Sequence, residues 1–240
     1  MFPRKEIKAN ARAALSAHYW PVVGILFLGA FLASILCLIG VVPMYVSMFR
    51  AAMRGMYGYT PSISGSSFIF ILIGFLVAIV IEVGIARFAY RVYRGDEPEV
   101  GDLFAGFKDG NFGRVVGGML LMTVKLLLWS LLLYFPLFIK AYEYSMLPYL
   151  LIDRPDLSIK ECFKMSKKMT KGHKWHLFVL DLSFLGWAIL GSITAGILDI
   201  FFVIPYMTLA QAGAYDFLKR TRMEEPQAET VEAEYSETTI

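Results

Sequence analysis

Four ionisable side chains lie inside long apolar stretches of this sequence: Glu82, Lys125, Glu143 and Asp181. A charge surrounded by hydrocarbon is costly and often marks an ion, proton or ligand site. If each stretch crosses a membrane, the three acids lie about eight residues, or roughly 12 Å, from the same face, and Lys125 lies slightly deeper. Such a cluster could bind a cation, a proton or a polar headgroup. The structural alternative is that Lys125 neutralises one acid and fixes helix packing.

Motifs for catalysis or metal binding are absent from the sequence. It contains no glycine-rich phosphate loop, no HExxH and no GxSxG. His173 and His176 are three residues apart, but they lie among lysines, without a cysteine or carboxylate to complete a metal shell. We therefore expect no catalytic residue, no metal, no cofactor and no enzymatic activity. A nucleic-acid partner is not expected either, because the basic residues follow the ends of the apolar stretches.

The composition determines what kind of element carries these residues. Hydrophobic residues make up 57% of the 240-residue chain and charged residues 18%, and the mean hydropathy is +0.58. Soluble domains are closer to half apolar and a quarter charged. The apolar residues here form long runs, and a helix of roughly 20 such residues crosses a bilayer. The sequence therefore predicts an all-α integral membrane protein.

We predict six membrane spans within a transmembrane domain of residues 21–222. The spans are 21–43, 68–90, 115–135, 136–152, 174–194 and 197–217. The fourth is short and carries Lys140 and Glu143, but six spans place every basic cluster on one side, as the positive-inside rule requires. Five spans would place the richest cluster, residues 153–174, outside. We therefore expect both termini to be cytoplasmic and the protein to lie in the cell membrane.

Three segments that precede apolar stretches have helical amphipathic patterns. They are an N-terminal segment within residues 1–20, a segment starting near Pro98, and residues 158–170, which open with a Ser158–Glu161 capping box. Each opens a pair of spans, so we expect three repeated units of amphipathic helix plus hairpin. Their basic faces suit the anionic lipids of a cytoplasmic leaflet, although connector helices packed on the bundle would look similar. Residues 223–240, with six glutamates, are predicted to be a disordered cytoplasmic tail.

Two stretches of the second half of the chain carry recognisable motifs, LDLSFLGW at residues 180–187 and the segment 135–149. They resemble the LSFIGW and IPGIIKxxxYSMxPY motifs, the second with Leu137 where the glycine is usual, of a bacterial multi-pass membrane family, the domain of unknown function 975. The resemblance covers nearly the whole chain except the acidic tail, and implies a membrane fold without an established activity. The motif residues that it singles out are Lys140, Tyr144, Asp181, Ser183, Gly186 and Trp187.

Three functions are compatible with these patterns. The leading hypothesis is a non-enzymatic, accessory membrane protein that binds anionic membrane lipids or another membrane protein. The alternative is a small transporter or ion-coupled permease whose path is lined by Glu82, Lys125, Glu143 and Asp181. A weaker third is a membrane enzyme acting on lipid, which would need His173, His176 and Asp181 to converge.

Overall fold

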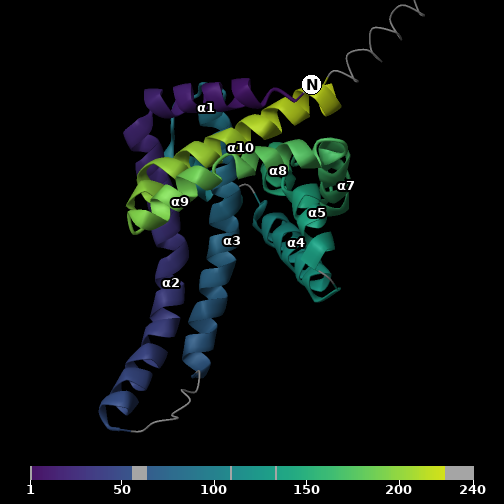
Figure 1. Cartoon of the computed structure of the whole chain (residues 1–240). Helices are drawn as coiled ribbons and strands as arrows, with labels where there is room; N and C mark the ends of the chain where they lie inside the picture. Colours follow the sequence, from purple (N-terminus) through teal and green to yellow (C-terminus); the bar gives the residue numbers. More distant parts are fainter. Residues whose placement is uncertain (1, 56–63, 109, 133, 225–240) are drawn as a thin grey trace, which may run out of the picture.

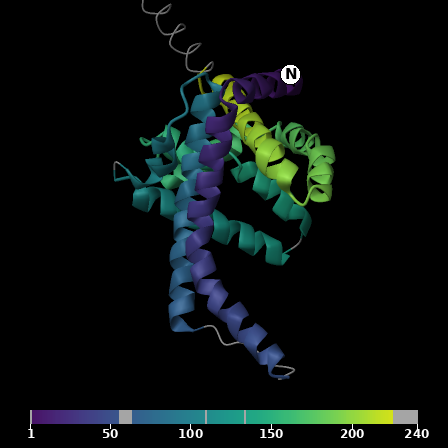
Figure 2. The same ribbon diagram turned by 90° about the vertical axis from the view of Figure 1, so that its left-hand side faces the viewer.

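The computed structural model describes residues 2–55, 64–108, 110–132 and 134–224, which form helices joined by short turns, without a strand. Two long helices, α2 (Tyr19–Met53) and α3 (Gly65–Tyr93), form a hairpin. All other helices gather around one end of this hairpin, and we call them the headpiece (Figure 1). The view turned by 90° shows the same arrangement, with the hairpin reaching well beyond the headpiece (Figure 2). The prediction of an all-α fold is confirmed for these residues.

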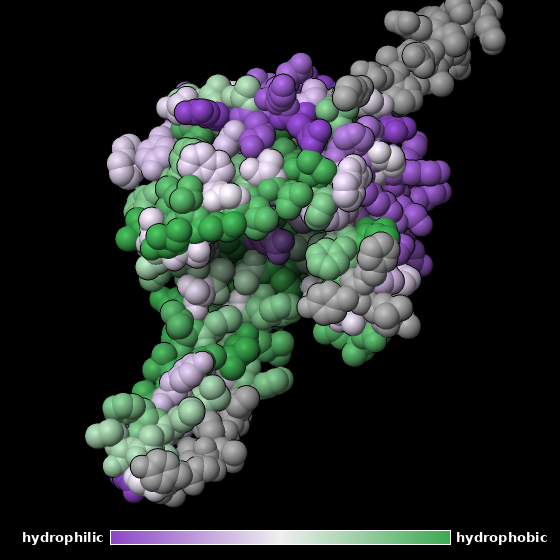
Figure 3. Space-filling model, in the orientation of Figure 1, coloured by the Kyte–Doolittle hydropathy of each residue, from purple (hydrophilic) through white to green (hydrophobic). Residues whose placement is uncertain are grey.

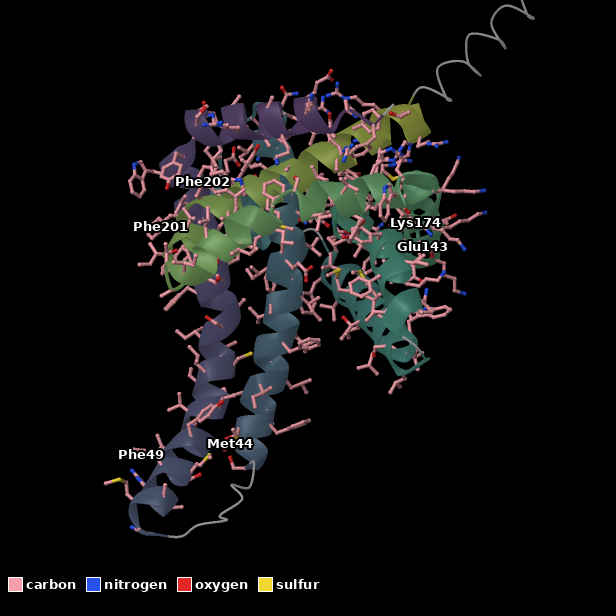
Figure 4. The ribbon with its side chains drawn as sticks, in the orientation of Figure 1. Met44, Phe49, Glu143, Lys174, Phe201 and Phe202 are labelled. Atoms are coloured by element: carbon pink, nitrogen blue, oxygen red, sulfur yellow. The ribbon has the colours of Figure 1, made fainter. Side chains whose placement is uncertain are left out.

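The hairpin is held together by close helix approach. A Cβ at Gly40 would lie 2.7 Å from the Ser67 carbonyl oxygen, and one at Gly74 would lie 2.7 Å from Cys37 Sγ. Small residues let apolar helices pack without side chains between them. The part of the hairpin beyond the headpiece, residues 38–53 and 65–75, exposes large apolar side chains such as Phe49 at its far end (Figure 4). We call this part the distal hairpin.

Among the described residues, four helical segments are long and apolar enough to cross a membrane: Tyr19–Met53, Gly65–Tyr93, Phe112–Leu131 and Lys174–Ile193. The predicted count of six spans is not confirmed. The predicted fourth span is divided into α5 (Tyr134–Tyr144) and α6 (Leu147–Asp153), each much too short to cross alone. Pro148 explains the division, because its ring would clash with the carbonyl of Tyr144, the last residue of α5.

The last two predicted spans are also interrupted. The fifth comprises α8 (Lys174–Leu182) and α9 (Leu185–Ile193), and the sixth comprises the π-helical turn η2 (Asp199–Val203) and α10 (Ile204–Lys219). The turn between them lies at Ala195 and Gly196, as predicted, and both residues have positive φ. In Figure 1, α9 and α10 cross the direction of the hairpin instead of running along it.

The three segments predicted to be amphipathic differ in structure. They are α1 (Arg4–Ala17), the 3₁₀ helix η1 (Val100–Phe107) and α7 (Ile159–Thr170). The predicted Ser158–Glu161 capping box of α7 is formed. The hairpins that follow are unequal: 35 and 29 residues for α2 and α3, but 21 and 11 for α4 (Phe112–Leu132) and α5. The threefold repeat is therefore not confirmed. From residue 225 onwards, the predicted acidic tail lies outside the described residues.

The headpiece packs around the second half of α3. This half contacts α2, η1, α6 and α10, and includes the fully buried Phe88. Glycine is required at Gly84, where a Cβ would overlap the backbone of Leu103 in η1. The fold therefore packs η1 directly against α3, near the charged C-terminal end of that helix.

Candidate functional site

Glu143 lies at the centre of an ion-paired group that joins three helices. Its carboxylate pairs with Lys140 on α5, 2.7 Å away, and with Lys174 at the start of α8 (Figure 4). The Ser166 hydroxyl of α7 donates to the Glu143 carbonyl oxygen at 2.6 Å. The predicted site residue Glu143 is thus neutralised by two lysines, and it fixes α5, α7 and α8 against one another.

Lys125 is held by aromatic rings instead of an acid. Its ammonium lies 3.7 Å from the centre of the Phe163 ring and 5.8 Å from that of Tyr144, and these two rings meet edge to face. Such cation–π contacts stabilise a half-buried ammonium by about 1 kcal/mol. Among the residues that the structure describes, no acid pairs with Lys125. The family-motif residue Tyr144 therefore acts in packing α4 on α5 and α7.

Asp181 accepts hydrogen bonds from neutral side chains. Its carboxylate accepts from the Tyr142 hydroxyl at 3.0 Å and from the Gln211 amide at 3.5 Å. These side chains line a cavity of about 90 Å³ between α5, α8 and α10, and Tyr149 of α6 also lines it. Glu82 is exposed on α3. The contacts of the described residues therefore do not join the four predicted charges into one network.

The two histidines lie apart from Asp181. His173 and His176 pack against the Phe2 ring at centroid distances of 5.8 and 5.7 Å. Burial, followed by the positive charge of Arg222, lowers the pKa of His173 below its ordinary value. The described part of the chain holds no group of three His, Cys, Asp or Glu residues arranged to bind a metal. The convergence that a lipid-active enzyme would need is not formed.

The remaining motif residues lie at the junction of α8 and α9. The Ser183 hydroxyl accepts a hydrogen bond from Lys8 of α1 at 3.0 Å, and Trp187 packs on Phe202 with centroids 5.2 Å apart. A Cβ at Gly186 would meet nothing within 4 Å, so helix packing does not explain the glycine. The motif thus joins the junction to the N-terminal helix through Ser183.

A second polar group was not predicted from the sequence. Asp102 of η1 is 4% exposed, and it pairs with Arg87 at 3.2 Å and with Arg91 at 3.0 Å. Beside these arginines, a cavity of about 240 Å³ extends to Asp153 of α6. The sequence contained a signal, because Arg87 and Arg91 are four residues apart and share a helix face.

The same cavity is bounded by aromatic stacking on its other side. Tyr215 of α10 stacks on Tyr149 with centroids 4.8 Å apart and donates to Asp153 at 2.7 Å, and Lys219 pairs with Asp153 at 2.9 Å. Every acid around this cavity therefore has a basic or hydroxyl partner. The arrangement fixes α3, α6, α10 and η1 together and contains no free nucleophile aligned with a base.

Comparison with known proteins gives one match. Residues 133–222 match the family model described as protein of unknown function (DUF975). No curated protein and no solved structure matches the chain. The matched segment contains α5 to α10 and all the motif residues, whereas the hairpin lies outside it, so the match is shorter than the nearly full-length resemblance seen in the sequence.

Proposed function

We propose that this chain, whose residues 133–222 match the model of the DUF975 family of proteins of unknown function, is a non-enzymatic integral membrane protein whose headpiece binds anionic lipids. The observation that carries the proposal is the division of its surface (Figure 3). Hydrophilic side chains gather along the top and right of the visible headpiece, and apolar side chains predominate over the rest of the visible face and along the hairpin. Such a division fits a protein that sits with its headpiece at one leaflet.

The basic residues of the headpiece lie where lipid phosphates would meet them. On α7 they form an exposed row: Lys160, Lys164, Lys167 and Lys168. Each basic residue near an anionic leaflet contributes about 1 kcal/mol to attraction. We propose that this side is cytoplasmic, that both termini lie there and that the bilayer is the cell membrane.

The charges within the apolar zone support a binding role more than a transport role. Glu143 has two lysine partners, and the Lys125 ammonium rests on rings. Partners of this kind offset the desolvation free energy of a buried charge, so that charge does not need a transported ion to compensate it. They account for two of the four predicted site residues as elements of helix packing.

Native mass spectrometry of the full chain in a gentle detergent tests this function. We expect peaks of the chain carrying one or more anionic phospholipids that survive delipidating washes. A second polypeptide at fixed stoichiometry would show instead that the headpiece serves as a docking site for another membrane protein. A bare chain with neither lipid nor partner would contradict the proposal.

Asp181 favours a second candidate function, a small transporter or ion-coupled permease. Its carboxylate lines the cavity of about 90 Å³ and has only neutral donors. If this function holds, Asp181→Asn should abolish substrate or proton flux in proteoliposomes, while Glu97→Gln, at an exposed position, should leave it unchanged. Flux that survives Asp181→Asn, or no flux in the wild type, would exclude it.

A further inference from the structure

An open groove runs between α1 and α10 on the headpiece. It has a volume of about 690 Å³ and is lined by Lys5, Lys8, Arg12 and Ser16 of α1 and by Tyr206 of α10. The α1 residues recur at helical spacing, so they form one stripe. The other side of α1 is anchored on the headpiece by buried Ile7, Ala11 and Leu15. The cationic stripe is therefore held in a fixed position above Tyr206.

The charges of this groove are unbalanced. Lys5, Lys8 and Arg12 all line it, and none of them forms an ion pair within the described part of the chain. The acidic residue of α1, Glu6, does not line the groove. By contrast, the cavity at Arg87 and Arg91 has Asp102 against it. Three uncompensated cations within one groove attract an anion.

Lys8 is positioned in the groove by its surroundings. Its ammonium donates to Ser183 at 3.0 Å and lies 4.6 Å from the centre of the Phe184 ring, and the Tyr206 hydroxyl donates to the Lys8 carbonyl at 3.2 Å. An ammonium has three donors, so two remain for a ligand. Burial lowers the pKa of Lys8, and an anion in the groove would oppose this shift.

An apolar surface continues from the groove. The Tyr206 and Phe202 rings pack together with their centroids 5.8 Å apart, and the Phe202 and Trp187 rings do so with centroids 5.2 Å apart. Trp187 is 40% exposed and Ile204 is 49% exposed. Figure 4 places Phe201 and Phe202 at the end of the headpiece that lies opposite the Glu143–Lys174 pair. A ligand with an anionic head and an apolar tail could thus contact cations and rings at the same time.

We propose that this groove binds the phosphate of an anionic glycerophospholipid between Lys5, Lys8 and Arg12, with an acyl chain over Phe202 and Trp187. The inference rests on the proposed function and adds a defined site to it. A soluble phosphate would use only the cations, whereas the lipid also uses the aromatic surface. The motif residues Ser183 and Trp187 then have roles, one in orienting Lys8 and the other in contacting the chain.

Phosphatidylglycerol titrated into the detergent-solubilised full chain, followed by native mass spectrometry, tests the site. Lys5→Gln combined with Arg12→Gln should weaken binding of the tightest lipid about 30-fold, because two basic contacts are lost. Both side chains are exposed, so the fold should be retained. The matched control is Arg50→Gln with Arg54→Gln at the C-terminal end of α2, which changes the net charge equally at exposed positions far from the groove and should weaken binding less than about threefold.

The outcomes separate the site from the function. If the wild type retains phosphatidylglycerol and Lys5→Gln with Arg12→Gln weakens its binding no more than the control does, the groove is not the site, while lipid binding itself stands. If the wild type retains no anionic lipid, the proposed function itself fails. Displacement of the lipid by soluble glycerol phosphate alone would overturn the lipid as the ligand, whereas resistance to displacement supports it.

Discussion

The distal hairpin and the headpiece are stabilised in different ways. In the distal hairpin, α2 and α3 contact each other through Gly40 and Gly74 and expose many large apolar side chains, such as Phe49. In the headpiece, ion pairs such as Arg91–Asp102 and Glu143–Lys140 join helices that are distant in the sequence. An apolar surface accepts lipid in any orientation, whereas an ion pair requires one geometry. The hairpin therefore needs only hydropathy and small residues, and the headpiece needs particular partners.

The largest effect is expected at Gly84, where α3 packs directly against the backbone of η1. Gly84→Ala places a methyl group against the Leu103 backbone and should destabilise the protein by about 3 kcal/mol. Gly24→Ala on α2 meets nothing within 4 Å and should be neutral or slightly stabilising. Thermal unfolding in detergent measures both. Equal effects of the two substitutions would show that η1 does not pack on α3 as described.

A smaller effect is expected at the arginine network. Asp102→Ala removes the partner of Arg87 and Arg91 and should cost about 2 kcal/mol, less than for a fully buried pair because Arg87 is 43% exposed. The control is Asp96→Ala, which removes an exposed partner of Arg91 and should cost under about 0.5 kcal/mol. Unfolding temperatures that fall equally for the two variants would contradict the buried role of Asp102.

Lys125→Met should have a weaker effect again. It keeps the length of the side chain but loses the cation–π contact with Phe163, so we expect a loss of about 1 kcal/mol and unchanged lipid binding. Lys164→Met, at an exposed position on α7, should leave stability unchanged. Loss of an ion flux in Lys125→Met, with stability intact, would instead favour the transporter.

The smallest effect concerns His173, where the headpiece meets the N-terminal residues. Its pKa is lowered in the folded state, so the folded state binds fewer protons than the unfolded state. Stability is therefore full above the ordinary pKa of 6.5 and declines as the pH falls from there towards the lowered value. The protection factors of the α1 amides, which correct hydrogen exchange for its intrinsic pH dependence, should fall over that pH range in the wild type and not in His173→Gln. Equal pH dependence in the two proteins would assign the change to another group.

Much of the helical architecture could be predicted from the sequence, because hydropathy and local capping depend on neighbouring residues. The all-α fold, the Ser158 capping box and the turn at Ala195 and Gly196 are of this kind. The division of the fourth apolar segment was missed because the positive-inside rule weighs charge and ignores the backbone restriction that Pro148 imposes.

The site was harder to predict, because its contacts join residues that are far apart in the sequence. Glu143 meets Lys174 31 positions away, and Asp181 meets Gln211 30 positions away. A one-dimensional pattern identified Glu143 and Asp181 as unusual but could not assign their partners. The Lys5–Lys8–Arg12 groove was visible only as a basic N-terminal segment, since its other wall is Tyr206, near the opposite end of the chain.

The length of α2 has a mechanical consequence. With 35 residues it is about 52 Å long, and the headpiece packs against one end of it only. A helix held in this way acts as a lever: a rotation of its packed end by about 10° would move the far end, at Phe49, by roughly 8 Å. Small rearrangements in the headpiece would therefore be magnified at the tip of the hairpin.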